Sequence, residues 1–390
     1  MKFNKLSAYC AAIGLAVLAG CGGGGGEGTS RSGLTAVKVM GDSLSDSGVF
    51  GNLGTGSGYG RIFSVQASPG VTTSIWTERI AALMGAPQLC NFYTFTGATF
   101  TPSPTCGSFA VGSGRINNRY QATPYNAAPF SIPTQIATAV SLGDFKSSDL
   151  LLIDGGGNDA ADLIGAYLTA STDGGASFAS MVTSTLTPVA AIGTALGTAD
   201  LATAGTLYMQ TLADEFYNSI KTNALEKGAT HIAVLNIPAV TKTPRFQMVL
   251  AGVEQQAGAQ ARAGVELLAN AWIQTFNARL ASKFADNSKV VVVDFYSAFL
   301  DQVAHPSQYG LTNVTTPACP ITGLGSDHLP TYNFETCTAA YLSANPPAGQ
   351  SGPDWWKTYA FSDGFHPTPY GYQLMSQLVS RSLAQAGWIQ

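Results

Sequence analysis

The chain has 390 residues, 45% of them hydrophobic, so it is long enough to bury a substantial core. Only 11% of the residues are charged, and the formal net charge is −4. Because no block of Lys or Arg residues follows the N-terminus, the sequence lacks the positive charge that nucleic-acid binding requires, and we exclude that class of function.

The N-terminal segment is predicted to be an export signal. Lys2 and Lys5 precede an apolar stretch over residues 6–19, which is too short to cross a bilayer as a mature helix. The sequence LAGC, which ends at Cys21, is similar to the lipobox of bacterial lipoproteins. This similarity implies a signal peptide over residues 1–20 and lipid attachment at Cys21. An ordinary secretory signal is the alternative, and both predict export.

A Gly-rich stretch follows, and residues 21–34 are predicted to form a flexible tether. The run GGGGGEGTSRSG cannot bury apolar surface and behaves as a coil. Acyl chains on Cys21 would hold the folded part at a membrane surface without spanning it. The residue after Cys21 is Gly22 and not Asp. By resemblance to the sorting rules of lipoproteins, this favours the outer membrane. The sequence favours neither face of that membrane.

From Thr35 onward, apolar strands alternate with amphipathic helices. Strands are predicted within residues 35–43, 149–159, 231–238 and 289–295, and helices within residues 74–85, 209–220, 268–284 and 368–387. This alternation predicts an α/β fold with a mostly parallel sheet that has helices on both faces. Ligands bind beyond the carboxyl ends of such strands, so Ser43 and Asn158 could meet there although they are far apart in sequence.

Two stretches interrupt the alternation within the single domain predicted over residues 35–390. The stretch near residues 166–205 is rich in small uncharged residues and could be a helical insertion, a cap or a mobile loop. The stretch near residues 311–353 is rich in turn residues, and so long a loop is usually functional or disordered.

The four cysteines that follow the export segment are predicted to form two disulfides. An exported protein reaches an oxidising compartment. Four cysteines allow three pairings, and nearness in sequence favours Cys90 with Cys106 and Cys319 with Cys337. A zinc site is the alternative, but no CxxC pair occurs and no histidine stands at ligand spacing from these cysteines.

Ser43 is a candidate nucleophile because it follows a predicted strand in the run VMGDSLSDSG. A serine needs a base that takes its proton and donors that stabilise the oxyanion. Of the four histidines, only His366 has a patterned acid, Asp363, in a turn ahead of the last helix. A D-x-x-H turn can hold a carboxylate against one imidazole nitrogen, although this spacing is also typical of an ordinary loop histidine.

Two glycine-containing turns offer candidate oxyanion donors. GGGND places Asn158 after a strand, and CGSFAVGSGRI contains Gly112. Gly155, Gly157 and Ala160 also match the dinucleotide fingerprint G-x-G-x-x-A. That motif belongs to the first strand of its unit and needs an acid at the end of a second strand, whereas the candidate acid, Asp173, follows no strand pattern.

Four blocks in this order resemble those of the SGNH or GDSL hydrolases. They are Gly41-Asp42-Ser43-Leu44, FAVGSGR, Gly156-Gly157-Asn158-Asp159 and Asp363-Gly364-Phe365-His366. The resemblance covers nearly the whole mature chain and implies a three-layer α/β/α fold with a flavodoxin-like five-stranded sheet. GLTNVTTPAC and FSDGFHPTPYG further resemble a branch of exported proteobacterial esterases that includes the esterase passengers of autotransporters.

The resemblance also implies roles for the candidate residues. Ser43 is the implied nucleophile, His366 the general base and later the general acid, and Asp363 the acid that orients the imidazole. The amides of Ser43 and Gly112 and the side chain of Asn158 are the implied oxyanion donors.

Two departures from known patterns bear on these roles. The second block has Gly112-Ser113-Gly114 where the family has paired glycines, so Gly114 is the alternative donor. Ser45 stands where G-x-S-x-G requires its last glycine, which excludes the strained nucleophile elbow. We therefore expect Ser43 at the start of a helix, where free backbone N–H groups favour a developing anion.

Taken together, these residues predict a serine carboxylic ester hydrolase of carboxylesterase or lipase type, which uses an acyl-enzyme and requires no metal or organic cofactor. A lipid acyltransferase or phospholipase with the same site is the first alternative, and a non-catalytic surface-binding lipoprotein is the second. We expect a monomer whose partners are ester substrates and, through its lipid anchor, a membrane. Aromatic residues that could line a substrate pocket or pack in the core are Tyr59, Phe63, Trp76, Trp355 and Trp356.

Overall fold

The computed structural model describes residues 33–118, 129–185, 187 and 189–389. The predicted signal peptide, Cys21 and nearly all of the predicted tether lie outside the described residues. Among the helices of the described ranges, none is both long enough and apolar enough to cross a membrane.

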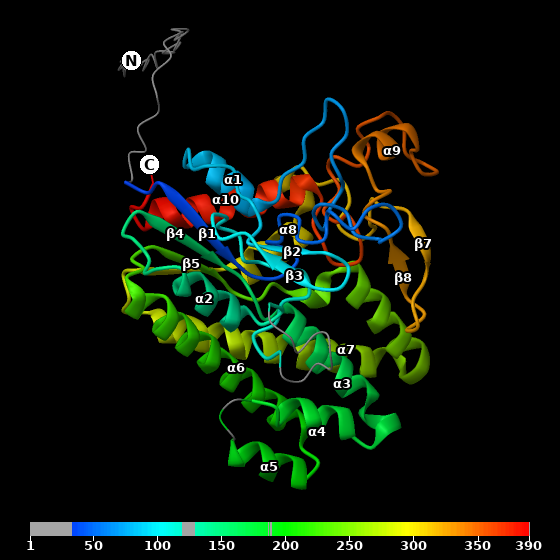
Figure 1. The fold of residues 1–390 in the computed structure, drawn as a ribbon. Coiled ribbons are helices and arrows are strands. Elements are labelled where there is room, and N and C mark those ends of the chain that lie inside the picture. The colour runs from blue at the N-terminus through cyan, green and yellow to red at the C-terminus, as the bar shows by residue number, and fades with distance from the viewer. Residues whose placement is uncertain (1–32, 119–128, 186, 188, 390) are drawn as a thin grey trace, which may run out of the picture.

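The central sheet has four parallel strands, and their spatial order is β1-β4-β5-β6 (Figure 1). Their bounds are Ala36–Met40 for β1, Asp149–Ile153 for β4, Ile232–Leu235 for β5 and Val290–Val293 for β6. All residues of β4 and β5 are buried, as continuous apolar runs in a sheet covered on both faces should be. The predicted α/β class with a parallel sheet is confirmed.

The prediction of a five-stranded sheet is wrong, because the described residues contribute four strands to the central sheet. At the free edge of β1, residues 107–111 run beside the strand and form only one parallel bridge, between Val39 and Ser108. Val39 donates to the Gly107 carbonyl at 2.9 Å, and the N–H of Phe109 donates to the Val39 carbonyl at 2.7 Å. Glycines at positions 107 and 112 flank this extended stretch, so it remains too short for a regular strand.

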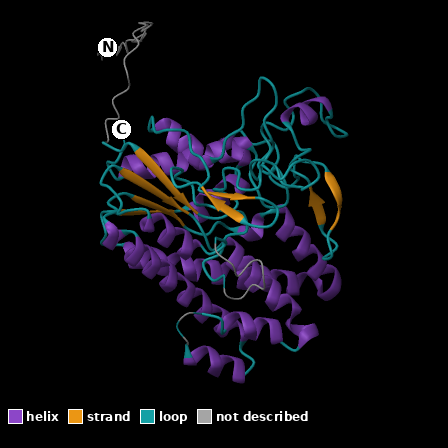
Figure 2. Cartoon of the chain, in the orientation of Figure 1, coloured by secondary structure: helices purple, strands orange, loops and turns teal. Residues whose placement is uncertain are grey.

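Helices cover both faces of the sheet and complete the three layers (Figures 1 and 2). One face carries α1 (Trp76–Leu83), α8 (Phe295–Ala304) and α10 (Pro369–Gln385). The other face carries α2 (Ile132–Ser141), α6 (Leu201–Asn223) and α7 (Pro244–Phe284), and α7 is interrupted at Gly258. Thr368 caps α10 by accepting a hydrogen bond from the N–H of Gly371, and Pro369 is the first helical residue, as the sequence predicts.

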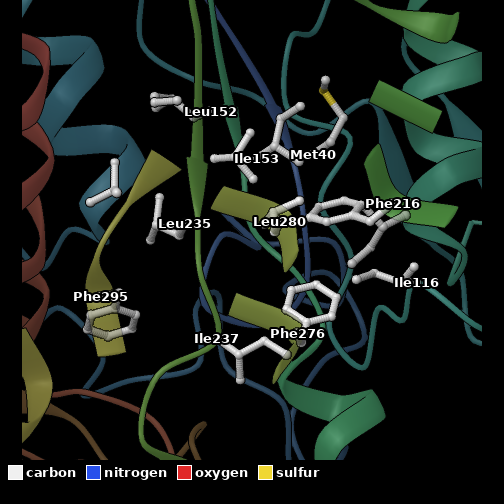
Figure 3. Close-up of a cluster of buried hydrophobic side chains, with 14 of the residues drawn as sticks. Met40, Ile116, Leu152, Ile153, Phe216, Leu235, Ile237, Phe276, Leu280 and Phe295 are labelled. Atoms are coloured by element: carbon white, nitrogen blue, oxygen red, sulfur yellow. The ribbon is translucent and has the colours of Figure 1, made fainter. Parts of the chain in front are cut away.

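The main hydrophobic core lies between the sheet and these helices (Figure 3). Phe216 of α6 and Phe276 and Leu280 of α7 are fully buried and lie with Ile153 and Leu235 of the sheet. The helical spacing of apolar residues in the sequence therefore identifies the faces that α6 and α7 turn toward the sheet.

The described residues of the stretch over 166–205 are mostly helical. It contains the end of α3 (Gly157–Asp173), then α4 (Ala176–Val182), α5 (Ala190–Gly197) and the first turn of α6. The break between α3 and α4 falls at Gly174 and Gly175, both of which have positive φ. Short 3₁₀ turns in other described parts of the chain are Leu225–Lys227, Val240–Lys242 and Pro306–Tyr309.

The stretch over residues 311–353 forms a small region with its own secondary structure beside the sheet. It contains the hairpin β7 (Ile321–Leu324) and β8 (Pro330–Tyr332) and the helix α9 (Ala339–Ala344). A second, smaller hydrophobic cluster surrounds Cys319 and Cys337 and includes Trp355 and Trp356.

The structure contains both predicted disulfides. Cys319 and Cys337 are joined with Cα atoms 5.4 Å apart, and Cys90 and Cys106 with Cα atoms 5.0 Å apart. The second of these bonds closes a loop that contains the hairpin β2 (Tyr93–Phe95) and β3 (Phe100–Pro102). Sequence-local pairing is therefore confirmed.

Gly205 of α6 allows close contact between α6 and α7. A Gly→Ala change inside a helix usually stabilises a protein, but at position 205 we expect it to destabilise this one. A Cβ at position 205 would lie 2.5 Å from the Trp272 ring, whereas a Cβ at Gly264 of α7 meets nothing within 4 Å. We expect Gly264→Ala to stabilise the protein by about 1 kcal/mol through helix propensity. We expect Gly205→Ala to destabilise it by about 1–3 kcal/mol through overpacking. Chemical denaturation of both variants tests this, and equal stabilisation by both would contradict the contact.

Candidate active site

Ser43 lies in a hydrogen-bonded turn directly after β1. The N–H of Ser45 donates to the Asp42 carbonyl at 3.1 Å, and among the described residues the first helix begins only at Trp76. The expectation that Ser43 starts a helix is therefore wrong. The side chains of Asp42 and Asp46 accept hydrogen bonds from the N–H groups that follow each of them, and such local bonds compete with helix formation.

The start of this turn is held by Gln135 of α2. The Gln135 side chain accepts the N–H of Gly41 at 2.8 Å and donates to the Gly41 carbonyl at 3.1 Å. A Cβ at position 41 would lie 1.9 Å from a carboxylate oxygen of Asp154. Only glycine leaves room for that carboxyl group, so the first glycine of the Gly-Asp-Ser run is required by packing.

Asp154 is a buried acid that the sequence analysis did not single out. It follows β4 directly, accepts the hydroxyl of Ser45 and contacts the N–H of Asp42 at 3.4 Å. The indole N–H of Trp76 completes this network by donating to the Ser45 oxygen at 3.1 Å. Burial, followed by the charge of Asp42, raises the pKa of Asp154 well above its ordinary value. The sequence DLLLIDGGGND could have indicated Asp154, because it places an acid directly after a buried strand.

His366 and Asp363 lie together in the turn before α10 and reach Ser43. The Nε2 atom of His366 is 2.8 Å from the Ser43 Oγ atom, and its Nδ1 atom is 2.8 Å from an Asp363 carboxylate oxygen. The other oxygen of Asp363 accepts the N–H groups of Phe365 and His366. The three residues that the sequence singled out are thus brought together in the order acid, imidazole and hydroxyl.

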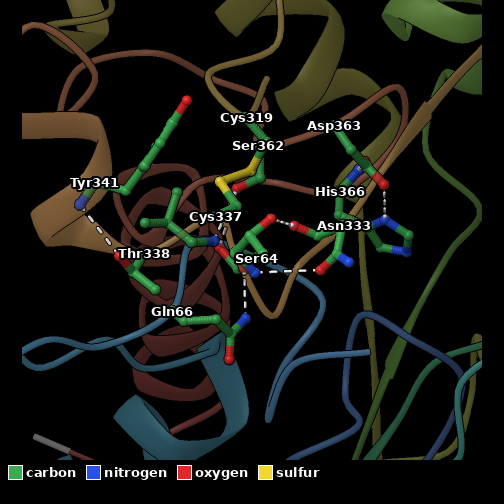
Figure 4. The surroundings of a disulfide bond; sticks show 12 residues. Ser64, Gln66, Cys319, Asn333, Cys337, Thr338, Tyr341, Ser362, Asp363 and His366 are labelled. Atoms are coloured by element: carbon green, nitrogen blue, oxygen red, sulfur yellow. Dashed lines mark hydrogen bonds and ion pairs between the residues drawn. A yellow bond between two sulfur atoms is a disulfide. The ribbon is translucent and has the colours of Figure 1, made fainter. Parts of the chain in front are cut away.

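The Cys319–Cys337 disulfide supports the loop that carries this pair (Figure 4). The N–H of Cys319 donates to the Ser362 carbonyl at 2.8 Å. The hydroxyls of Ser64 and Ser362 both donate to the Pro367 carbonyl, at 2.8 and 2.9 Å. The segment that carries Asp363 and His366 is therefore fixed on both sides.

The acid and the imidazole shift each other's pKa in opposite directions. Burial alone would lower the pKa of His366, but the charge and hydrogen bond of Asp363 raise it above its ordinary value. Burial alone would raise the pKa of Asp363, but His366 and the two backbone N–H groups lower it. The carboxylate therefore favours a protonated imidazole, which is the state that a histidine base reaches when it takes a proton.

The structure contradicts the assignment of Gly112 as an oxyanion donor. The N–H of Gly112 donates to a carboxylate oxygen of Asp46 at 2.8 Å, and the N–H of Gly114 donates to the Val111 carbonyl at 3.0 Å. Both candidate amides are already used inside the protein. A Cβ at Gly112 would also lie 2.4 Å from the Phe63 ring, so packing explains this glycine.

Ser113 lies between these glycines and faces the cavity beside Ser43. Its φ of 66° is in the left-handed region, which is uncommon for a residue other than glycine. Among the hydrogen bonds of the described residues, none takes the backbone N–H of Ser113 or of Ser43. Asn158, in the first turn of α3, faces the same cavity, and its side-chain amide donates to the Gly114 carbonyl at 2.9 Å.

A cavity of about 310 Å³ opens from these residues. Ser43, His366 and Asn158 lie in its wall, and most of the remaining wall is apolar. The apolar residues include some from β5 and the segment after it, and others from α7, α8 and α10: Leu235, Val240, Phe246, Phe295, Phe299 and Leu374. A site of this size and character suits a small molecule with an apolar part.

The remaining candidates have structural positions. Asp159 is buried and accepts the N–H groups of Ile116 and Asn117, and burial raises its pKa to about 6. Asp173 lies at the end of α3 and binds the N–H groups that follow it, so the dinucleotide alternative lacks its acid. In the parts of the chain that the structure describes, no three metal-ligating side chains come together.

Of the aromatic candidates, Phe63 lines the cavity and its ring lies 5.1 Å from the His366 ring. Trp76 is fully buried beneath the Ser43 turn, and Trp355 and Trp356 belong to the smaller hydrophobic cluster. Tyr59 is 43% exposed and stacks on Phe50. Only one of the five therefore contributes to the cavity wall.

Comparison with known proteins gives one family. The sequence model described as GDSL-like lipase/acylhydrolase matches residues 37–379, a range that includes Ser43, Asn158, Asp363 and His366. No curated protein matches the chain.

The pairing of Asp363 with His366 predicts how the histidines titrate. We expect NMR titration to place the pKa of His366 above the ordinary value of about 6.5 and that of His231, which is lowered by burial, below it. Asp363→Asn removes the negative charge, so the pKa of His366 should fall while that of His231 stays unchanged. A His366 pKa that does not respond to Asp363→Asn would contradict the pairing.

Proposed function

Because the chain belongs to the GDSL-like lipase/acylhydrolase family, we propose that this hydrolase cleaves carboxylic esters through an acyl-enzyme formed on Ser43. One observation carries the proposal. The hydroxyl of Ser43 is within hydrogen-bond distance of an imidazole that a buried carboxylate orients from the opposite side. This is the arrangement that turns a serine into a nucleophile.

In the first half of the reaction, Ser43 Oγ attacks the ester carbonyl carbon while its proton passes to His366 Nε2. The carbonyl π electrons move to the oxygen and give a tetrahedral oxyanion. When the carbon–oxygen bond to the alcohol breaks, His366 returns the proton to the leaving alkoxide. Asp363 holds the imidazole in the tautomer that accepts at Nε2 and stabilises the imidazolium in between.

The oxyanion requires donors aimed at the reacting carbon, and we assign this role to the N–H groups of Ser43 and Ser113 and to the side-chain amide of Asn158. All three residues line the cavity beside the serine hydroxyl, and neither backbone N–H has a partner among the described residues. Ser113 replaces Gly112 in this assignment because the Gly112 N–H is bound to Asp46. The positive φ of Ser113 is consistent with a backbone held for function, since strained residues gather at active sites.

In the second half, a water molecule attacks the acyl carbon, His366 takes one of its protons, and Ser43 Oγ leaves with that proton. The acid is released and the enzyme returns to its first state. An alcohol in place of water would give acyl transfer through the same steps. The apolar wall of the cavity favours hydrophobic acyl groups for both outcomes, so a lipid acyltransferase or phospholipase is the second candidate.

We further propose that the protein is exported. Two disulfides suit an oxidising compartment such as the periplasm or the cell exterior, and they support the signal segment inferred from the sequence. Attachment at Cys21 would keep the hydrolase at a membrane surface, where lipid esters are abundant.

Removal of the nucleophile tests the proposal directly. We expect Ser43→Ala to lower kcat for 4-nitrophenyl butyrate by about 10⁴-fold or more. Ser47→Ala is the matched control, since Ser47 belongs to the same run but donates to Asn91, away from the site, and it should stay near wild type. A fluorophosphonate should label wild type and not Ser43→Ala. Equal activity in Ser43→Ala and wild type would overturn the proposal.

A second measurement separates acyl transfer from hydrolysis. With butanol added to the reaction, the yield of butyl ester reports transfer, and the yield of free acid reports hydrolysis.

The oxyanion assignment predicts a second set of rates. Asn158→Ala should lower kcat about 10²–10³-fold with little change in KM, because the lost hydrogen bond forms only as charge develops on the oxygen. Ser113→Gly keeps the backbone N–H and accommodates a φ of 66° without strain, so its kcat should stay within about twofold of wild type. Unchanged kcat in Asn158→Ala would exclude Asn158 from the oxyanion site.

A further inference from the structure

The cavity extends from Ser43 along the carboxyl ends of the strands toward α8. Ser43 follows β1, and α8 follows β6, which lies three strand positions away in the sheet. At a strand spacing of about 4.8 Å this separation is about 14 Å. Residues of α8 and the serine line the same cavity. A substrate that fills the cavity therefore has one end at the nucleophile and the other at α8.

The face that α8 turns to the cavity ends in a polar residue. Phe295, Phe299 and Gln302 stand at spacings of four and three, so they share one face of the helix. All three are buried and line the cavity. An apolar side chain at position 302 would continue the stripe, but the chain places an amide there.

The Gln302 amide has no partner among the described residues, although the residue is only 9% exposed. The neighbouring polar residues of the wall differ in this respect. Asn236 bonds to Asp294 and accepts the N–H of Tyr296, and the hydroxyl of Thr243 donates to the Val240 carbonyl. The Gln302 amide is therefore free to bond a group inside the cavity, and the few polar groups in the wall of an apolar pocket commonly orient a ligand.

We propose that Gln302 binds a hydroxyl group at the far end of the substrate's acyl group, an inference that rests on the proposed ester hydrolysis. The substrate class is then an ester of a hydroxylated acid whose body is apolar, either an alkyl chain or an aromatic ring. The apolar body lies against Phe295 and Phe299, and the amide of Gln302 both accepts from and donates to the distal hydroxyl.

The acyl group suits this position better than the alcohol does. It stays covalently attached to Ser43 until water releases it, whereas the alcohol must leave after the first half of the reaction. We therefore assign the apolar cavity to the part that remains attached. A site built to bind a hydroxyl also discriminates against the analogue that lacks it, because the amide is then left unpaired.

The experiment compares kcat/KM for matched methyl esters. One pair is 3-phenylpropanoate and 3-(4-hydroxyphenyl)propanoate, and the other is octanoate and 8-hydroxyoctanoate. Wild type should prefer the hydroxylated member of at least one pair by about fivefold to tenfold, the effect of one hydrogen bond. Gln302→Leu and Gln302→Met, which keep the volume, should lose this preference and gain on the unsubstituted esters. Gln308→Leu, an exposed position just beyond α8, should behave as wild type.

Hydrolysis of methyl acetate, which does not reach α8, should be unchanged in all these variants and shows that the catalytic residues are intact. If wild type hydrolyses the esters but its preference is absent, or is the same in both Gln302 variants, the inference is overturned while ester hydrolysis stands. A Gln302-dependent preference between 2-phenylethyl acetate and 2-(4-hydroxyphenyl)ethyl acetate would instead place the alcohol there and overturn the acyl assignment. If wild type hydrolyses none of these esters, the proposed function itself fails.

Discussion

The active site depends on the 2.8 Å hydrogen bond between Ser43 and His366, which joins two loops 323 positions apart in the sequence. Neither residue lies in a helix or strand, so each loop has its own support. Gln135 and the buried network of Asp154 hold the turn of Ser43. The Cys319–Cys337 disulfide and hydrogen bonds to the Pro367 carbonyl hold the loop of His366. An error of about 1 Å in either loop would lower the rate strongly, which explains why so much buried polar structure serves one contact.

The acids around this contact differ because their surroundings differ. Burial raises the pKa of Asp46 and of Asp159 to about 6, although each accepts several backbone N–H groups. Asp363 is buried as well, but its pKa is lowered because an imidazole that can carry positive charge lies against it. Hydrogen bonds to uncharged donors only reduce the cost of burying a carboxylate, whereas a cationic partner reverses the shift. Aspartate thus fixes loops at positions 46 and 159, whereas at position 363 it orients the imidazole of His366.

The sequence predicts the parts of this structure that depend on periodicity and on ordered motifs. The parallel sheet, the helices around Phe216 and Phe276 and both disulfides are confirmed, and the separation of Ser43 from His366 in sequence does not obscure their pairing. Predictions that depend on single backbone groups fail. Nothing in FAVGSGR shows that the Gly112 N–H is bound to Asp46, because that depends on how two loops meet. The turn at Ser43 was missed for the same reason, since its hydrogen bonds replace a helix only in the folded chain.

The two ends of the cavity come from different parts of the chain, and this division separates chemistry from substrate choice. Ser43 and the amide of Asn158 follow β1 and β4, whereas much of the apolar wall, including Val240, Phe295 and Phe299, follows β5 and β6. Side chains on α8 contact neither the Asp154 network nor the disulfide-bound loop through any hydrogen bond among the described residues. Phe299 of α8, however, packs against Phe361 of the loop that carries His366. We therefore expect a change at Gln302, rather than at Phe299, to alter which acyl group binds without moving the Ser43–His366 contact. If the proposed function holds, the β6 side of the cavity selects the acyl group, and the contact between Ser43 and His366 sets the rate of the chemical step.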